Sequence, residues 1–250
     1  MDNNKSEFDK IAKEYSDNRI KDLGKLGKYS DTAFIYKVQL MKHILKKEPK
    51  TILDFGCGIG SNIPYLHSYF KNAKLYGCDV SVESIEIAKN KYEYCDFKTV
   101  DNINDLQCYK NIDCIFISTV LHHIPREEHK TWLDGLYNIL TDVSNSDGGT
   151  IIIFEHNMKN PITRSIVKKS KIDENAVMLN SIYCKRLLLN IFYQTKIKNK
   201  EISLKKNNVK LKFTYFFPWR NKIFNFIENI IYWLPLGAQY CVYAQKRNKL

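Results

Sequence analysis

Five short apolar runs constrain what this chain can fold into more than any other feature. They lie at residues 51–55, 74–79, 97–100, 112–118 and 150–154. Most of the segments between them repeat their apolar residues every three or four positions, as amphipathic helices do. Strands that alternate with helices at this spacing predict a parallel sheet with right-handed crossovers.

The pattern changes on either side of these runs. Residues 1–48 have helical spacing and predict an N-terminal helical lid. Beyond residue 156 we expect helices at 181–192 and 221–233, a lysine-rich hairpin of strands 195–204 and 209–217, and an antiparallel final strand at 239–245. The predicted fold is α/β: a Rossmann-like, seven-stranded, mostly parallel sheet with an antiparallel final strand, helices on both faces and the N-terminal helical lid.

Composition fits one folded domain. The chain has 250 residues, of which 44% are hydrophobic and 26% charged, so we expect residues 1–250 to form a single domain. The run 223–236 is too short to span a bilayer, and the N-terminus lacks a secretory apolar segment. The seven cysteines stand singly, with no C-x-x-C pair. We therefore expect no disulfide framework, no metal site and a cytoplasmic location.

Positive charge is concentrated in one stretch. Residues 159–212 hold fourteen Lys or Arg against three acids, nearly the whole formal charge of +12. Such a field attracts anions such as nucleotide phosphates, nucleic acid or acidic lipid. A solvated basic surface explains the same counts equally well.

The strongest local motif is D-F-G-C-G-I-G at residues 54–60, directly after the first predicted strand. Glycines let a ligand approach the backbone, and the following helix start offers free N–H groups. Asp54 is expected at the carboxyl edge of the sheet, where α/β proteins bind ligands and where its carboxylate can pair with a cationic amine.

A dinucleotide site is the rival interpretation of this turn. Two features disfavour it, because the spacing is G-x-G-x-G rather than G-x-G-x-x-G and Asp54 would face a pyrophosphate. Asp79, at the end of the second strand, suits the two hydroxyls of a ribose in either case. The residues thus indicate a nucleoside ligand.

Taken together, these motifs resemble the class I S-adenosylmethionine (SAM)-dependent methyltransferases. The resemblance includes the glycine motif, the ribose acid Asp79, the pair Val100–Asp101 and the segment I-D-C-I-F-I-S-T-V-L-H-H-I-P at 112–125. It implies SAM as cofactor, S-adenosylhomocysteine (SAH) as product, and a division into a lid (1–48), a cofactor-binding half (49–156) and an acceptor-side half (157–250). The later part of the chain is similar to a bacterial subgroup associated with surface-glycan and secondary-metabolite pathways.

The resemblance also implies which residues contact the cofactor. The methionyl part would lie against the loop, the ribose on Asp79, and the adenine beside Asp101 and Asn102. The full set is Asp54, Gly56, Cys57, Gly58, Gly60, Asp79, Val80, Asp101, Asn102, Val120 and His122.

Catalytic candidates follow the fourth and fifth strands. They are His123, Glu155 and His156, of which His156 is the preferred acceptor-side residue because neutral histidine is an apt base near pH 7. Glu155 is also interpreted as a loop-bracing carboxylate. Arg164 and Lys168 are candidates for binding an anionic acceptor, although a solvated helix face explains them equally well. Tyr15 is a candidate for closing over the cofactor, and ordinary core packing is the alternative.

The sequence leaves three functions open. The first is methyl transfer to oxygen or nitrogen of a small anionic metabolite or a nucleotide- or phosphate-linked glycan precursor, as in polysaccharide biosynthesis. The others are RNA or protein methylation, and SAM binding without turnover. Nucleic acid is the less favoured partner because no appended RNA-binding module is present. The aromatic segment 213–233 suits peripheral membrane contact, although we expect its helix to pack on the core. The expected state is a monomer or homodimer.

Overall fold

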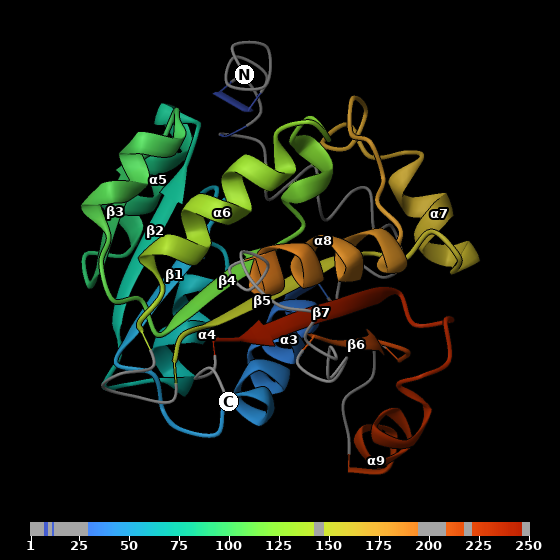
Figure 1. Ribbon diagram of the computed structural model, residues 1–250. Coiled ribbons are helices and arrows are strands. Elements are labelled where there is room, and N and C mark those ends of the chain that lie inside the picture. The colour runs from blue at the N-terminus through green and yellow to red at the C-terminus, as the bar shows by residue number, and fades with distance from the viewer. Residues whose placement is uncertain are drawn as a thin grey trace.

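The computed structural model describes residues 8, 9, 12, 30–142, 148–194, 209–217 and 222–246 (Figure 1). Its sheet has the order β3-β2-β1-β4-β5-β7-β6. The strands are β1 (Thr51–Phe55), β2 (Lys74–Asp79), β3 (Cys95–Thr99), β4 (Cys114–Ser118), β5 (Thr150–His156), β6 (Val209–Thr214) and β7 (Gln239–Gln245).

Five of these strands run parallel, and β7 pairs antiparallel with β5 and with β6. The predicted α/β fold, a seven-stranded mostly parallel sheet with an antiparallel final strand, is therefore confirmed. The registers align the strand ends, because Phe55 lies beside Cys78 of β2 and Ile117 of β4. The loops that follow β1, β2, β4 and β5 thus meet at one edge of the sheet.

Helices cover both faces of the sheet. In Figure 1, α6 and α8 cross in front of the strands and α3 and α4 lie behind them. The α-helices are α3 (Ser30–Ile44), α4 (Ile63–Tyr69), α5 (Val82–Lys91), α6 (His129–Ile139), α7 (Pro161–Val167), α8 (Ser181–Gln194) and α9 (Lys222–Ile231), and the 3₁₀ turns are η3 (Ile103–Cys108) and η4 (Leu121–His123).

Alternation along the central strands divides the core in two. In β4, Ile115 and Ile117 join the cluster that contains Leu133 of α6, whereas Phe116 joins the cluster that contains Met41 of α3. Successive side chains of a strand point to opposite faces, so a strand buried on both faces is apolar throughout. This is why the fourth run carries no polar residue between Cys114 and Ile117.

Several predicted boundaries shift. Strand β3 begins at Cys95 rather than residue 97, and α6 begins at His129, after the turn that Pro125 starts. The predicted strand 195–204 and the turn of its hairpin lie outside the described residues. Within the described part of the chain, β6 takes its partner from β7 instead, with Val209 beside Ala244.

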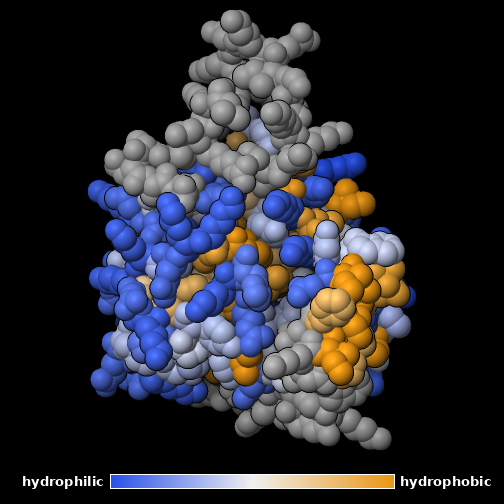
Figure 2. All heavy atoms as spheres, turned by 90° about the horizontal axis from the view of Figure 1, so that it is seen from below, coloured by the Kyte–Doolittle hydropathy of each residue, from blue (hydrophilic) through white to orange (hydrophobic). Residues whose placement is uncertain are grey.

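Helix α9 differs from the expected core helix. Glu228 is buried and accepts the backbone N–H groups of Phe216 and Phe217, which ties this face to the segment that follows β6. The opposite face is exposed and apolar, and Figure 2 shows it as a hydrophobic patch. Its large exposed side chains are Ile223, Phe226 and Ile230, continued by Tyr232, Trp233 and Leu236. No described helix has the length and apolar character needed to cross a membrane.

Candidate functional site

The glycine-rich turn after β1 wraps the end of β2. The backbone N–H groups of Gly56 and Cys57 donate to the Cys78 carbonyl at 2.8 and 2.9 Å. Gly58 has φ +52°, and a Cβ built on it would meet no atom within 4 Å. Gly60 has φ +79°, but a Cβ there would lie 2.9 Å from the Tyr92 ring. The turn therefore packs tightly at its end and leaves open space at its centre.

Asp79 fixes this turn from the neighbouring strand. Its carboxylate accepts the Gly58 N–H at 2.8 Å and the Ser81 N–H at 3.0 Å, and Val80 adds a third backbone contact. Burial raises the pKa of Asp79 against these hydrogen bonds, which lower it. The Asp79 carboxylate thus fixes the glycine-rich turn through hydrogen bonds to its backbone. It also lies at the end of β2, where the ribose is expected.

Asp54 is fully buried under the same turn. Its Oδ2 accepts the Asn62 side-chain amide at 3.3 Å, while Asp54 Oδ1 and Asn62 Oδ1 are buried without a hydrogen-bond partner. Burial raises the pKa of Asp54 to about 7, although the Asn62 hydrogen bond and the charge of Lys37 oppose it. Two unsatisfied buried acceptors indicate that a donor-bearing ligand completes this site.

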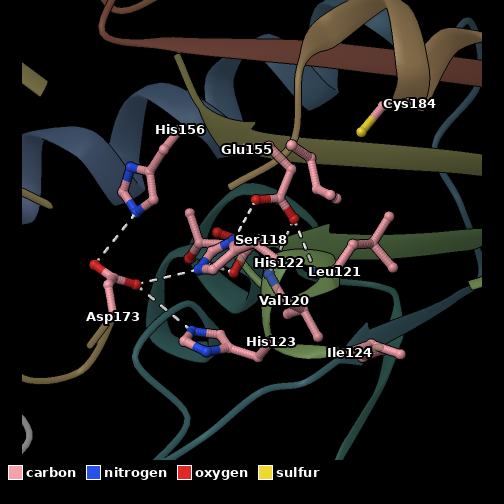
Figure 3. Close-up of polar contacts among 12 residues, drawn as sticks. Ser118, Val120, Leu121, His122, His123, Ile124, Glu155, His156, Asp173 and Cys184 are labelled. Carbon is pink, nitrogen blue, oxygen red and sulfur yellow. Dashed lines mark hydrogen bonds and ion pairs between the residues drawn. The ribbon is translucent and has the colours of Figure 1, made fainter. Parts of the chain in front are cut away.

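A second group of polar side chains lies after β4 and in the last two residues of β5, and Figure 3 shows three imidazole rings around one carboxylate. Asp173 Oδ1 lies 3.2 Å from His122 Nε2 and 3.6 Å from His123 Nε2, and Asp173 Oδ2 lies 4.0 Å from His156 Nε2. We call these residues, with Glu155, the histidine cluster. It brings together the three predicted catalytic candidates and His122.

Glu155 holds the loop after β4. Its Oε1 accepts the N–H groups of Val120 and Leu121 at 3.2 and 2.9 Å, and its Oε2 contacts His122 Nδ1 in a short hydrogen bond. Since Glu155 is 1% exposed, all of these contacts are shielded from water. The geometry matches the bracing interpretation of this residue.

The histidines of the cluster differ in the direction of their pKa shifts, which is upward for His122 and downward for His123 and His156. Burial alone would lower the pKa of His122, but the Glu155 charge and the hydrogen bonds with Asp173 and Glu155 raise it to about 9. Burial and the neighbouring His122 lower the pKa of His123 to about 3. Burial, opposed by the Asp173 charge, lowers the pKa of His156 to about 4. The pKa values of Glu155 and Asp173 fall despite burial, because both contact His122.

The other predicted residues occupy varied positions. Asp101 and Asn102 are exposed after β3, and the Asn102 side chain caps η3. Arg164 directs its guanidinium to the Met158 carbonyl at 3.1 and 2.9 Å, and Lys168 is exposed. Tyr15 lies outside the described residues. The contacts of these residues with cofactor or acceptor stay predictions.

The described N-terminal residues reach both parts of the site. Asp9 accepts the Ser81 hydroxyl at 2.6 Å and the Glu83 N–H at 3.3 Å, beside the turn after β2. The Phe8 and His123 rings form a T-shaped contact with 5.0 Å between their centroids. These contacts place residues 8 and 9 over the carboxyl edge of the sheet, where a lid would lie.

Comparison with known proteins identifies the central part of the chain. Residues 52–142 match the sequence model of the family described as "Methyltransferase domain". By this match, residues 52–142 form a methyltransferase domain. The match includes the glycine-rich turn, Asp79 and the loop after β4, so it confirms the recognition made from those motifs and SAM as the cofactor.

Two curated relatives of the methyltransferase domain act on different acceptors. A tRNA N(3)-methylcytidine methyltransferase of Schizosaccharomyces pombe is 30% identical over 105 residues, or 38% of this chain and 41% of that protein. A trans-aconitate 2-methyltransferase of Yersinia pseudotuberculosis is 36% identical over 62 residues, 25% of this chain and 24% of that protein. The chain thus matches less than half the length of either relative.

Solved structures extend the likeness of fold beyond the domain match. The plantazolicin methyltransferase BamL, crystallised with a substrate analogue and SAH, has a TM-score of 0.59 at 19% identity and covers 96% of this chain and 99% of its own. A SAM-dependent methyltransferase of Archaeoglobus fulgidus has a TM-score of 0.57 at 19% identity and covers 84% and 92%. At this identity the likeness shows the fold.

The residues of the methyltransferase domain fit SAM. The cofactor has a cationic amine that can donate hydrogen bonds to the buried oxygens of Asp54 and Asn62. It also has a ribose whose hydroxyls can donate to the Asp79 carboxylate. The open space at Gly58 allows close approach to the turn. The chemistry of these donors and acceptors therefore agrees with the family.

Sequence reasoning missed two parts of the site around the methyltransferase domain. Lys37 of α3 is 4% exposed and donates to the Ser118 hydroxyl at 2.7 Å, at the end of β4. Its charge acts on both Asp54 and His156. Asp173, which joins the histidines, stands more than fifty residues after His122 in a lysine-rich stretch. No local pattern marks either residue, because both are brought in by tertiary contacts.

Proposed function

We propose that this chain transfers the methyl group of SAM to an oxygen or nitrogen atom of a small anionic acceptor, such as a nucleotide- or phosphate-linked precursor of a surface glycan. The observation that carries the proposal is the position of the histidine cluster. Its residues from the sheet lie after β4 and at the end of β5, at the same sheet edge as the glycine-rich turn after β1. An acceptor beside the cluster would therefore lie next to the cofactor site.

In this proposal, separate residues bind the cofactor and act on the acceptor. When bound, SAM supplies a methyl group that is electrophilic because its sulfur is positively charged. Asp54, Asn62 and Asp79 hold the cofactor, and the Gly58 backbone lies against it. His156, at the end of β5 and 22% exposed at its side chain, faces the acceptor and receives its proton where the acceptor must lose one. Lys37 lies between the two halves and adds positive charge.

The anionic character of the acceptor is inferred from the border of the site. Asp173 belongs to a segment that also carries the exposed residues Lys168, Lys169 and Lys171. Positive side chains beside a binding site attract an anion and raise its local concentration. Because Arg164 is bound to the Met158 carbonyl, these lysines are the better candidates for that attraction.

RNA is the second candidate acceptor. The identity to a tRNA methyltransferase and the fourteen basic residues in 159–212 favour it. A nucleic-acid substrate would bind with strong salt dependence, because phosphate contacts release counterions. A small acceptor with one or two negative charges would show a much weaker dependence.

A transfer assay on the full chain tests the proposal. SAM labelled in its methyl group is offered with sugar nucleotides, sugar phosphates, small carboxylic acids and tRNA, and SAH formation is followed. We expect turnover with a small anion, retained SAM binding but at least tenfold lower turnover in His156→Ala, and no change in His43→Ala, a surface control. Failure of the wild-type protein to bind SAM and SAH in calorimetry, with uptake of a nicotinamide dinucleotide, contradicts the proposal. SAM binding without transfer to any acceptor supports a non-catalytic protein instead.

A further inference from the structure

The histidine cluster has the composition and spacing of a metal site. The donor atoms of His122, His123 and Asp173 all lie within 4.8 Å of one another. Around a tetrahedral ion with bonds of about 2.1 Å, neighbouring ligand atoms lie roughly 3.4 Å apart. The two separations from Asp173 Oδ1, 3.2 Å to His122 Nε2 and 3.6 Å to His123 Nε2, bracket this value.

Glu155 supplies the outer contact that metal-binding histidines usually have. It binds Nδ1 of His122, so Nε2 of the same ring points toward Asp173 (Figure 3). A carboxylate on the far nitrogen fixes the orientation of the ring and makes the other nitrogen a better ligand. Glu155 is itself held by two backbone N–H groups, so the orientation of His122 is set before any ion binds.

Charge and access also suit a cation. Glu155 and Asp173 bring two carboxylates into a largely buried cluster, which a divalent ion would balance. The side chain of His122 is 1% exposed, whereas those of His123 and Asp173 are 15% and 10% exposed. His122 is thus the enclosed ligand, whereas His123 and Asp173 keep a small exposure. Three protein ligands leave the fourth position of a tetrahedral ion free, as in metals that also bind a substrate atom.

We propose that His122, His123 and Asp173 bind one divalent transition-metal ion, with Zn²⁺ as the best fit. Two imidazoles and a carboxylate suit zinc, iron or manganese and disfavour Ca²⁺ and Mg²⁺, which prefer oxygen ligands. The open position is left for an oxygen atom of the acceptor, beside His156. This second step rests on the proposed function, whereas metal binding itself does not.

This inference differs from the sequence-based expectation of no metal site, which was drawn from the cysteines. None of the cysteines is among the proposed ligands, and six of the seven are buried. The ligands proposed here are an adjacent pair of histidines and an aspartate about fifty positions later, a spacing that matches no compact metal motif.

Metal binding can be measured on the intact chain, purified without a histidine tag. Bound metals are first counted by mass spectrometry, and the chelator-treated protein is then titrated with ZnCl₂ and, separately, with MgCl₂. We expect one Zn²⁺ per chain and no comparable binding of Mg²⁺. Zn²⁺ affinity should fall roughly a hundredfold in Asp173→Asn and His123→Gln and stay unchanged in His43→Gln. Co²⁺ should give the visible absorption of a four-coordinate nitrogen and oxygen site in the wild type and in His43→Gln, but not in Asp173→Asn or His123→Gln.

SAM binding serves as the folding control for each variant. A wild-type protein that binds Zn²⁺ no better than a folded Asp173→Asn variant overturns the proposal, since any zinc would then lie elsewhere, for example on the exposed Cys108. Failure of the proposed function has a different signature, because it removes methyl transfer and leaves one Zn²⁺ bound. Transfer that survives complete removal of metal rejects the role toward the acceptor only.

Discussion

The carboxylate of Asp79 accepts the backbone N–H of Gly58 at 2.8 Å, across the gap between the second strand and the loop that follows the first. The residue proposed to bind the ribose therefore also shapes the turn that is proposed to face the rest of the cofactor. A hydrogen bond to a charged group contributes about 1.5–3 kcal/mol. Loss of this carboxylate should consequently affect binding twice, through the ribose and through the loop.

We expect Asp79→Ala to weaken SAM binding by roughly tenfold to a hundredfold, because a loss of about 1.5–3 kcal/mol changes a dissociation constant by that factor. Asp79→Asn should weaken it to a similar extent, because an amide nitrogen cannot accept the N–H groups of Gly58 and Ser81 together with ribose hydroxyls. Calorimetric titration with SAM and with SAH measures the change. Equal affinity in wild type and Asp79→Ala would remove the ribose assignment.

Two glycines of the turn should respond differently to alanine. At Gly58 a methyl group meets no atom of the protein, so only the positive φ is penalised, at about 1–2 kcal/mol. The same methyl group would occupy the space beside the turn, so we expect SAM affinity to fall more than tenfold. At Gly60 the methyl group would lie 2.9 Å from the Tyr92 ring, and overpacking adds about 1–3 kcal/mol.

Thermal unfolding and SAM titration of both variants separate these effects. Gly58→Ala should lose binding with a small fall in Tm, whereas Gly60→Ala should show the larger fall in Tm. The reverse order would mean that the cofactor does not approach Gly58.

The proposed cofactor side could be located largely from the sequence, because its residues are close together along the chain. Asp54 and the glycines follow one strand directly, and Asp79 ends the next. The acceptor side was accessible only in part. His122, His123 and Glu155 follow predicted strands, but their mutual contact depends on strand order.

The partners from other elements could not be predicted. Asp173 comes from the segment between α7 and α8, and Lys37 from a helix that precedes the sheet. Periodicity likewise could not tell which side of α9 would pack, because both sides carry apolar residues and the deciding contact is the buried carboxylate of Glu228.

Helix α9 offers a direct test of this last point. Glu228→Ala leaves the N–H groups of Phe216 and Phe217 without their acceptor and should destabilise the protein by about 1–3 kcal/mol. Phe226→Ser, on the exposed face of the same helix, should change the free energy of unfolding by no more than about 0.5 kcal/mol. Urea unfolding of the two variants measures both values. A larger loss in Phe226→Ser would show that the exposed face is covered in solution.

Glu155 is expected to act by positioning the loop after β4. Removal of one partner from a buried charged pair costs about 3–5 kcal/mol, so Glu155→Ala should lower the free energy of unfolding by that order. Glu155→Gln keeps one oxygen for the N–H groups of Val120 and Leu121 and should lose less. Urea unfolding gives the two values, and an equal loss in both would mean that charge, rather than the loop contacts, dominates.

Asp54 should make both stability and cofactor binding depend on pH. Burial raises its pKa to about 7, above the ordinary value of 3.8, so the folded protein holds this proton more tightly than the unfolded chain. The resulting stabilisation is complete below about pH 4 and is lost as the pH rises to 7. A cationic amine prefers the ionised carboxylate, so SAM affinity should instead fall as the pH drops below 7.

Asp54→Asn tests this dependence. It should bind SAM weakly, and its affinity should no longer change between pH 5 and pH 8. Calorimetry in buffers of different ionisation enthalpy should detect a proton that is released on SAM binding to the wild type alone. Wild-type binding that is flat over this range, with no proton released, would mean that Asp54 does not meet the amine.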